Sequence, residues 1–376
     1  MGYCGADRMP NVGMDHAGRR DRAAARSGAA GVAALLLSPG SDLTYLSGYR
    51  IFSSERLTCL VLSSDGAATL VVPALESPRA AAAAPDLAQL TWTETADPYA
   101  LVASRVTASG PIGVSDQMWA SFALGLQRAL PGRAFRVASE ITRELRMRKD
   151  PAELAALRAV SASADRAYAR ALDLEFAGRT ERAVGADLAA LLRDDGHDEV
   201  MFTIVAAGEN GASPHHHTGD RVIRTGDTVV LDFGGTRAGY GSDITRTVQV
   251  GGRASDEAVK VHDIVRRAQE AGYVSAREGA TARSVDAAAR AVIAEAGYGE
   301  FFIHRLGHGI GLDGHEHPYL VSGNDQLLEP GMAFSLEPGV YLPGRFGVRI
   351  EDIAIVGGDG RCESLNQAER ALATVR

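Results

Sequence analysis

The feature that most limits how this chain can fold is an acidic strand–turn–strand unit that occurs twice. In residues 227–250, two β-rich stretches, Thr228–Phe233 and Asp243–Val250, flank a glycine-rich turn, which predicts a hairpin. Asp232 stands near the end of the first strand, and Asp243 begins the second. Antiparallel pairing would bring these two carboxylates together, where each would disfavour ionisation of the other. A multivalent cation between them removes that penalty.

The same plan returns in residues 332–356, with glutamates in place of aspartates. Glu337 follows a strand, and a turn is expected that contains Pro338-Gly339 and Pro343-Gly344. A second strand then carries Glu351. Each acidic residue taken alone is equally explained as a solvated side chain beside a turn, but the agreement of four positions favours one shared site.

A histidine segment with many glycines, residues 301–317, lies between the two acidic units in the sequence. Its histidines are His304, His308, His315 and His317. The interspersed glycines argue against a helix, so we expect a short strand over Phe301–His304 that runs into a loop. A glycine-rich turn with surface histidines is the alternative. Four carboxylates with one imidazole suit Mn²⁺, Co²⁺, Fe²⁺ or Zn²⁺, and bridging carboxylates can hold two ions about 3.5–4 Å apart that acidify a shared water.

Length, charge and cysteine content exclude several classes of protein. At 376 residues the chain is long enough for two domains, and its net charge of −8 leaves no basic surplus for nucleic-acid phosphates. Its three cysteines are far apart, so no disulfide framework or CxxC metal site is expected. Residues 1–13 are polar and predict a loose extension rather than a signal peptide. No apolar run reaches the roughly 20 residues of a membrane span, so we expect a cytoplasmic protein without a membrane partner.

Alternating strands and helices predict an α/β domain over residues 14–142. The helices expected there are Asp15–Ala30, Pro78–Ala88, Pro98–Ala108 and Met118–Leu130, and the expected strands are residues 32–38, Leu57–Leu62, Ala68–Val72 and Gly113-Val114. A second domain is predicted over residues 143–376, where Asp150 and Glu153 have the spacing of a helix capping box. Four helices are expected to flank its acidic units: Pro151–Leu172, Thr180–Asp194, Ala254–Arg277 and Ser284–Ala296. The predicted class is therefore α/β (α+β).

Several motifs of the second domain resemble those of the pita-bread metallopeptidases, the family of prolidase and aminopeptidase P, with methionine aminopeptidase and creatinase as relatives. The matching motifs are SPHHH, LDFGGTRAGYGSDITRT, HRLGHGIGLDGHEHP, SLEPGVY and RIEDIAIV. Residues 147–356 carry the closer likeness, and LSPGSDLTYLSGYR more loosely resembles the N-terminal domain of the proline-specific branch. The resemblance implies a creatinase-like N-terminal α/β domain followed by a pita-bread domain with two α-β halves related by a pseudo-twofold axis.

The resemblance also implies which residues carry the chemistry. The implied metal ligands are Asp232, Asp243, His308, Glu337 and Glu351. They are implied to hold two divalent ions per subunit, Mn²⁺ first, with Co²⁺ or Zn²⁺ as alternatives. Glu337 would also take the proton of the bridging water. His215 matches a histidine near the leaving side of the scissile bond, and His304 and His315 match two that contact the substrate carbonyl.

The implied activity is hydrolysis of Xaa-Pro dipeptides, of the prolidase type, by a metal-bridging hydroxide. A dipeptidase needs a cation for the free carboxylate of proline, and Arg345 and Arg349 are the candidates. Arg345 is otherwise a turn residue, and Arg349 otherwise orients Glu351. Neither His216 nor His217 is given a role. The alternatives are an aminopeptidase P that acts on longer Xaa-Pro peptides and a catalytically silent pita-bread binding protein. The resemblance also implies a homodimer, with the first domain reaching toward the partner's active site.

Overall fold

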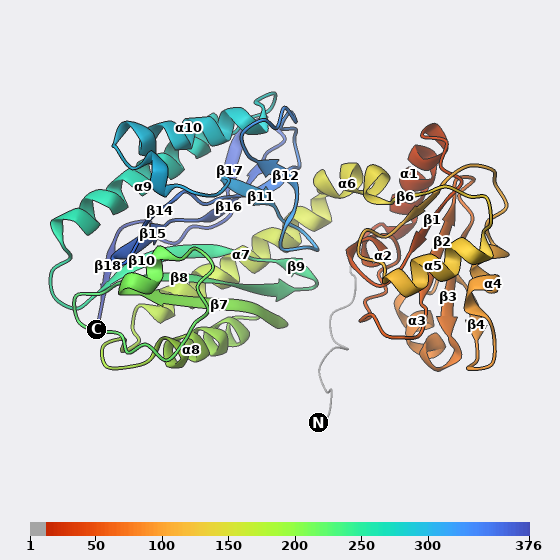
Figure 1. Ribbon diagram of the computed structural model, residues 1–376, viewed down its shortest axis with the longest axis horizontal. Helices are drawn as coiled ribbons and strands as arrows, with labels where there is room; N and C mark the ends of the chain where they lie inside the picture. Colours follow the sequence, from red (N-terminus) through yellow and green to blue (C-terminus); the bar gives the residue numbers. More distant parts are fainter. Residues whose placement is uncertain (1–12) are drawn as a thin grey trace. The chain divides into compact units, whose positions relative to one another are not determined.

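The computed structural model describes residues 13–376, which divide between Arg146 and Met147 into two compact units (Figure 1). The extension predicted for the first 13 residues lies, except for the last of them, outside the described residues. The predicted domain boundary between residues 142 and 143 falls inside helix α6 (Ser139–Met147). Among the described residues, no helix has both the length and the apolar character that a membrane crossing requires.

The first unit is built on one mixed sheet with the strand order β4-β3-β2-β1-β5-β6. Its strands are β1 (Ala34–Leu37), β2 (Cys59–Ser63), β3 (Ala68–Pro73), β4 (Ala88–Trp92), β5 (Ile112–Val114) and β6 (Phe135–Val137). Besides α6, its helices are α1 (His16–Ala29), α2 (Ser41–Ser47), α3 (Ser77–Ala83), α4 (Pro98–Ala103) and α5 (Ala120–Ala129). The central strand β1 is buried along its whole length and pairs antiparallel with β2 and parallel with β5. The predicted α/β class of this part is confirmed.

The helix predicted over Pro78–Ala88 is too long. Helix α3 ends at Ala83, because Pro85 cannot continue a helix and also disfavours the helical conformation of the residue before it. The next residues turn, and Ala88–Trp92 then forms strand β4, which pairs parallel with β3. The alanine-rich composition of this stretch concealed the strand.

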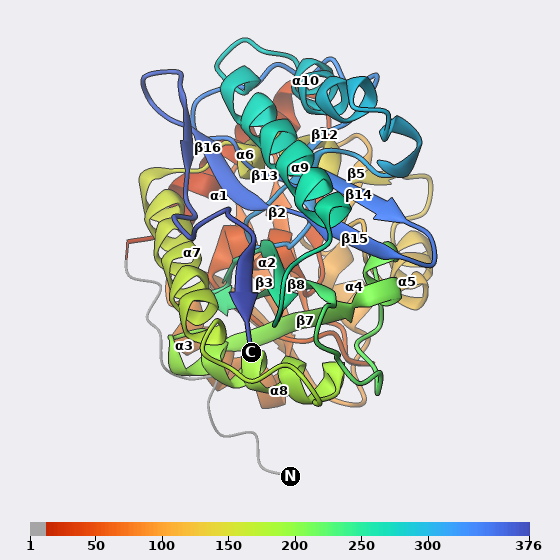
Figure 2. The same ribbon diagram turned by 90° about the vertical axis from the view of Figure 1, so that its left-hand side faces the viewer.

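The second unit consists of two halves, and each half has a five-stranded sheet covered by two helices (Figures 1 and 2). The first half has helices α7 (Pro151–Ala171) and α8 (Glu181–Asp194), strands β7 (Glu199–Ala207), β8 (Thr228–Arg237), β9 (Tyr240–Gly241) and β10 (Ile244–Val250), and the C-terminal strand β18 (Ala373–Val375). The second half has helices α9 (Asp256–Ser275) and α10 (Ala282–Glu295), and strands β11 (Gly307–Gly309), β12 (Glu316–Leu320), β13 (Ala333–Leu336), β14 (Gly339–Leu342), β15 (Phe346–Arg349), β16 (Asp352–Val356) and β17 (Cys362–Ser364). The second half also has a separate two-stranded sheet, β14-β15.

Each half has its own apolar core between its helices and its sheet. In the first half, Leu188 of α8 belongs to the same buried cluster as Leu231 and Phe233 of β8. In the second half, Val265 of α9 shares a buried cluster with Phe334 of β13. In each half, two helices bury one face of a sheet, as the predicted repeat requires. The two-halved α/β architecture is therefore confirmed.

The four helices predicted for this unit are present, and two begin at the predicted caps. Asp150 accepts a hydrogen bond from the Glu153 backbone N–H, and the Glu153 side chain accepts one from the Asp150 backbone, which completes the capping box of α7. Thr180 caps α8 by accepting from the Ala183 N–H. This cap places Glu181 in the first turn of α8, at the positive end of the helix dipole.

Two local predictions in the second half are wrong. Phe301–His304 is not a strand; a short 3₁₀ turn ends at Phe301, and the strand of this segment is Gly307–Gly309. Gly309 is needed there because a Cβ would overlap the backbone of His317 in the paired strand β12. Gly339 begins strand β14 and pairs with Arg349 rather than forming a turn; a glycine is needed there because a Cβ would overlap the ring of Tyr341 in the same strand.

Candidate metal centre

The five predicted metal ligands lie together, on strands from both halves of the second unit. Asp232 lies in β8, and Asp243 immediately precedes the paired strand β10. His308 is the middle residue of β11, Glu337 follows β13, and Glu351 precedes β16. Ligand atoms of Asp232, Asp243 and Glu351 all lie within 4.8 Å of one another, as do those of His308, Glu337 and Glu351. Glu351 belongs to both groups, as a carboxylate that bridges two ions would.

The two aspartates are buried and incompletely hydrogen-bonded. Asp232 is 7 % exposed and Asp243 is 6 % exposed. Within residues 13–376, the Oδ1 atom of each has no hydrogen-bond partner. Burial, with the neighbouring Asp232 charge adding to it, raises the pKa of Asp243 well above its ordinary value. Buried unpaired carboxylate oxygens are costly, and a cation is the partner that would satisfy both at once.

The two glutamates are held by hydroxyl groups. The Ser335 hydroxyl donates to Glu337 Oε1 at 3.0 Å, and the Thr245 hydroxyl donates to Glu351 Oε2 at 2.6 Å. The Glu351 backbone N–H also donates to the Thr245 carbonyl at 3.0 Å, which joins the first half to the second. Burial raises the pKa of Glu337 to about 7, and burial beside Asp243 raises the pKa of Glu351 well above its usual value.

His308 presents one ring nitrogen to this acidic cluster. Its Nδ1 lies 3.0 Å from the Gly309 carbonyl oxygen, which can only accept, so Nδ1 carries the proton and Nε2 has a free lone pair. Nε2 lies 3.3 Å from Glu337 Oε1 and 3.8 Å from Asp243 Oδ2. Burial, with His315 adding to it, lowers the pKa of His308 to about 3, so the ring is neutral near pH 7. A neutral imidazole fixed by a backbone carbonyl is the usual form of a histidine metal ligand.

Residues of the cluster therefore fit divalent metal ions. Carboxylate oxygens with one imidazole form a donor set that suits Mn²⁺, Co²⁺ or Zn²⁺ and does not resemble the cysteine-rich set of a structural zinc site. The orphaned Oδ1 atoms of Asp232 and Asp243 are the structural observation that favours an ion over a purely hydrogen-bonded cluster.

Three further histidines surround the cluster. The His315 ring centre lies 3.8 Å from that of His308, and His315 also forms a ligand-distance group with Asp243 and His308. His304 is engaged on both sides, because Nδ1 donates to the Arg305 carbonyl at 2.7 Å and Nε2 accepts from the Tyr341 hydroxyl at 2.8 Å. Burial lowers the pKa of His304 to about 4 and also lowers the pKa of His315.

His215 lies on an exposed loop near two of these histidines. Its charge is among the groups that lower the pKa of His304 and of His315, so all three rings belong to one neighbourhood. His216 follows it in the loop and is directed away from solvent, toward Glu181. His317, which was given no firm role, packs its ring 4.7 Å from that of Tyr319.

The two arginines predicted to bind substrate have different surroundings. Arg349 is 3 % exposed, and its guanidinium donates to Asp232 Oδ2 at 2.6 Å and to the Tyr341 hydroxyl at 2.9 Å. Arg345 lies in the turn between β14 and β15, exposes about half of its side chain, and forms an ion pair with Glu257. Arg345 therefore lies in a turn, as its alternative states, whereas the carboxylate that Arg349 contacts is Asp232 and not the expected Glu351. A substrate contact by either arginine stays a prediction.

Sequence reasoning missed Arg305 and Tyr341. Arg305 stacks over the ring of Tyr319, with its guanidinium carbon 4.3 Å from the ring centre, and its Nη2 donates to His315 Nδ1 at 3.3 Å. Across the described part of the chain, no acidic side chain forms an ion pair with Arg305. The only available signal was its place beside His304 in the histidine segment. Tyr341 ends the SLEPGVY motif but was not singled out, because nothing local shows that its hydroxyl bonds to His304 and to Arg349.

The chain matches two protein families. Residues 155–357 match the metallopeptidase family M24, and residues 19–148 match the creatinase/prolidase N-terminal domain. The first match covers more than half of the chain, including most of the second unit and all five residues of the candidate metal centre. These two matches confirm the creatinase-like first domain and the pita-bread second domain.

Relatives of known sequence and structure agree with these matches. The probable dipeptidase PepE of Mycobacterium tuberculosis is 48 % identical over 96 % of both chains. The Xaa-Pro dipeptidase of Lactobacillus helveticus is 37 % identical over 85 % of this chain and 88 % of its own length. The crystal structure of dipeptidase PepE from Mycobacterium ulcerans superposes with a TM-score of 0.92 at 43 % identity, covering 98 % of this chain and all of that one. By sequence, fold and the residues at its candidate centre, the chain belongs to the M24 metallopeptidases, and it is a hydrolase of peptides.

Proposed function

We propose that this chain hydrolyses Xaa-Pro dipeptides at a centre of two divalent metal ions held by the five ligands described above. The observation that carries the proposal is the pair of buried Oδ1 atoms on Asp232 and Asp243, which lack a partner among the described residues. Glu351 lies within ligand distance of both three-residue groups, which supports two adjacent ions rather than one.

The relatives support this substrate class. The Lactobacillus helveticus protein is named an Xaa-Pro dipeptidase, and the Pyrococcus furiosus protein with the same name is 36 % identical over 64 % of this chain. Among solved structures, the prolidase from Thermococcus sibiricus superposes with a TM-score of 0.91 at 37 % identity. The Lactobacillus helveticus and Thermococcus sibiricus proteins match 85 % and 96 % of this chain, so each likeness extends over both units.

Bound ions would supply an acidified water molecule and positive charge beside the scissile carbonyl oxygen. Glu337 is the residue placed to hold the proton that this water loses, since its carboxylate lies 3.3 Å from His308 Nε2 at the centre of the cluster. Ser335 fixes the orientation of that carboxylate and also accepts from the His308 backbone N–H at 3.0 Å. One hydroxyl therefore aligns the proton acceptor and a metal ligand together.

His315 has the hydrogen-bonding state needed to stabilise the developing oxyanion. Arg305 can only donate, so His315 Nδ1 accepts and its Nε2 carries the proton. That N–H is available to donate to the substrate carbonyl oxygen as its negative charge grows. His304 can contribute in the same way only by exchanging its bond to Tyr341, because its Nδ1 proton is held by the Arg305 carbonyl.

Arg305 is the cation best placed to receive the free carboxylate of proline. It has no acidic partner within the described residues and lies beside His315 at the edge of the centre. We expect Arg305→Gln to raise KM for Ala-Pro by about 10- to 100-fold, because a charge-assisted hydrogen bond contributes roughly 1.5–3 kcal/mol. Steady-state kinetics with Ala-Pro and with its C-terminal amide measures this. KM for the amide should change little in Arg305→Gln, because the amide has no carboxylate. Arg345→Gln is the matched control, and a larger rise of KM in that variant would move the carboxylate site to the β14–β15 turn.

Release of the first residue from longer peptides is the second candidate activity. The X-Pro aminopeptidase of Thermotoga maritima superposes with a TM-score of 0.83 at 31 % identity and covers 95 % of this chain. Cleavage of Ala-Pro and Ala-Pro-Ala, each with Mn²⁺, Co²⁺ and Zn²⁺ in turn, separates the two activities. Preference for the dipeptide supports the proposal, and equal or faster cleavage of the tripeptide supports the aminopeptidase. If neither substrate is cleaved with any of the three metals, both candidate activities are ruled out.

Three finer features stay predictions. Mn²⁺ as the cellular metal rests on the donor set, which Co²⁺ and Zn²⁺ also satisfy. The homodimer is implied by family resemblance, and sedimentation of the purified protein tests it. Metal analysis of protein purified without added metal would count the ions per subunit, for which we expect two.

A further inference from the structure

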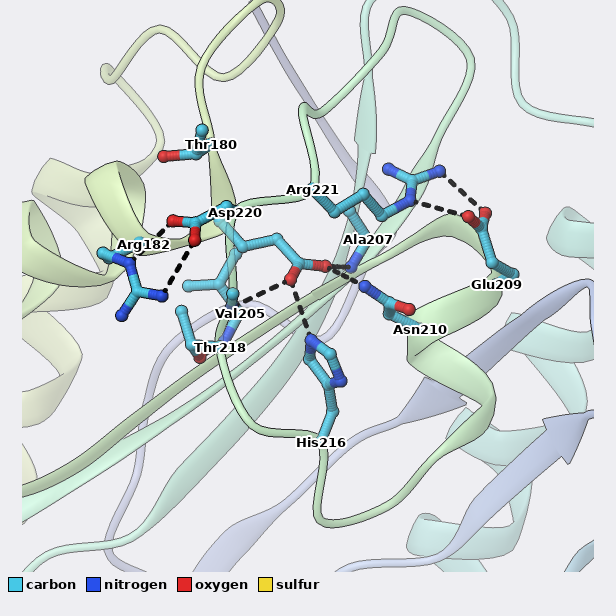
Figure 3. A network of polar contacts seen from close by, with 12 residues as sticks. Thr180, Arg182, Val205, Ala207, Glu209, Asn210, His216, Thr218, Asp220 and Arg221 are labelled. Atoms are coloured by element: carbon cyan, nitrogen blue, oxygen red, sulfur yellow. Dashed lines mark hydrogen bonds and ion pairs between the residues drawn. The ribbon is translucent and has the colours of Figure 1, made fainter.

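The loop that carries His215 is fixed to the rest of the protein by several hydrogen bonds, although part of it is exposed. Residues 213–219 follow the 3₁₀ turn Gly208–Ala212 and contain three consecutive histidines. His215 and His217 are exposed, whereas His216 is partly buried and points inward (Figure 3). The middle histidine of the three therefore fixes the loop to the protein, and its two neighbours face outward.

The partner of His216 is a carboxylate buried at the start of α8. Glu181 has a side chain with 0 % exposure, and its Oε2 accepts from His216 Nε2 at 2.8 Å and from the Gly219 N–H at 3.2 Å. Its Oε1 accepts from the Ala207 N–H and from the Asn210 side-chain amide, both at 2.9 Å (Figure 3). Four donors and the N-terminal end of a helix stabilise this buried charge.

Two other contacts fix the loop on either side of His215. The Pro214 carbonyl accepts from Arg349 Nη1 at 3.2 Å, and the same guanidinium binds Asp232. The Thr218 hydroxyl accepts from the Val205 N–H at 2.9 Å and donates to the Thr203 carbonyl at 3.0 Å, both on strand β7. His215 thus lies between a carbonyl tied to the metal centre and a histidine tied to Glu181.

We infer that Glu181 and His216 form a buried clamp that positions His215 for the reaction. The clamp acts only through His215, so both members are positioning residues rather than catalytic ones. The inference rests on the proposed function, because His215 is the residue that would meet the substrate. It also explains a run of three histidines of which two are given no role by the family resemblance.

The first test compares kcat for Ala-Pro in three loop variants. We expect His216→Ala to lower kcat by about 10- to 100-fold, since a displacement of about 1 Å in a reacting group costs this much. His216→Gln keeps an amide donor that reaches toward Glu181 and should recover much of the loss. His217→Ala is the matched control on the same loop and should stay near wild type. Equal kcat values in His216→Ala and His217→Ala would overturn the clamp.

A double variant separates positioning from any direct role. In a His215→Ala background, His216→Ala should cause no further loss of kcat, because the residue on which the clamp acts is already gone. A further loss of similar size in that background would mean that His216 acts by another route. Glu181→Gln should resemble His216→Ala, since the amide turns one acceptor oxygen into a donor that faces two donors.

Hydrogen exchange distinguishes failure of the clamp from failure of the proposed function. In His216→Ala, backbone amides of residues 213–219 should exchange faster than in wild type, while amides of β8 and β10 should not change. This readout does not require activity, so it decides the clamp even if wild-type protein does not cleave Ala-Pro. Unchanged exchange in residues 213–219 would overturn the inference whatever the substrate proves to be.

Discussion

The two acidic hairpins share a plan but differ in what lies between their carboxylates. In the first half, β8 and β10 pair directly, and Asp232 and Asp243 keep oxygens without a partner among the described residues. In the second half, a whole extra hairpin, β14 with β15, lies between Glu337 and Glu351, and both glutamates accept bonds from hydroxyl groups. Each aspartate therefore keeps one oxygen free for a cation, whereas each glutamate has a hydroxyl group that fixes its orientation.

The halves also support each other through two buried arginines, and in different ways. Arg349, at the end of β15 in the second half, donates directly to the Asp232 carboxylate of the first. Arg246, in β10 of the first half, reaches the second half through the Glu351 backbone carbonyl at 2.7 Å and through Asp352 Oδ1 at 2.6 Å. One arginine thus acts on a ligand side chain, and the other on the strand that carries a ligand. We expect the first to control metal affinity and the second to control stability.

The largest effect should follow from loss of the oriented proton acceptor. Glu337→Gln removes the charge and keeps the size of the side chain, so kcat for Ala-Pro should fall by about 10²- to 10⁴-fold, the range for a general base. Steady-state kinetics at saturating metal measures this. Ser335→Ala, which frees the Glu337 carboxylate and the His308 backbone N–H but keeps both of those side chains, is the matched variant and should cost less. A larger loss in Ser335→Ala than in Glu337→Gln would contradict the assignment of Glu337.

Arg246→Met should have the next largest effect, and mainly on stability. Removing Arg246 leaves Asp352 with only the partly exposed Arg370 as a cationic partner, and breaking a buried ion pair typically costs about 3–5 kcal/mol. Urea unfolding of metal-saturated protein measures the free energy of unfolding. Arg370→Met is the control, because Arg370 also binds Asp352 but is 35 % exposed, so its loss should cost less. An equal decrease in the free energy of unfolding in the two variants would show that the burial of Arg246 does not determine how much it contributes to stability.

Local signals in the sequence predicted the first hairpin better than the second. The β8–β10 hairpin follows from alternation and a glycine-rich turn, and the capping box at Asp150 follows from residues three apart. The turn at Pro343-Gly344 was predicted, but the two strands that it joins were not, because Pro338-Gly339 looks like part of the same turn. A Pro-Gly pair has the same local pattern in a turn and at the start of a strand.

The same limit applies to the candidate centre. The acidic and histidine positions could be proposed because the side chains themselves suit a metal and occur at strand ends. The residues that hold these ligands in place could not be proposed from the sequence, since Arg246 and Arg349 contact residues that are more than 100 positions away. A buried arginine and a surface arginine look alike in a sequence, so Arg349 and Arg345 received the same predicted role. Arg305 was missed for the same reason.

Arg349→Lys gives the smallest of these effects and tests the comparison most directly. Lysine can keep one charged contact to Asp232, but it cannot also reach the Tyr341 hydroxyl and the Pro214 carbonyl as the planar guanidinium does. We expect metal affinity to fall by about 10- to 100-fold, the usual cost of losing a group that orients a ligand. Competition with a chelating dye measures the affinity, and Arg246→Lys is the matched control, which should lower the free energy of unfolding and leave affinity near wild type. If both variants lose metal affinity equally, the two arginines have the same role, and the distinction between an arginine that orients a ligand side chain and one that supports the strand next to a ligand has to be abandoned.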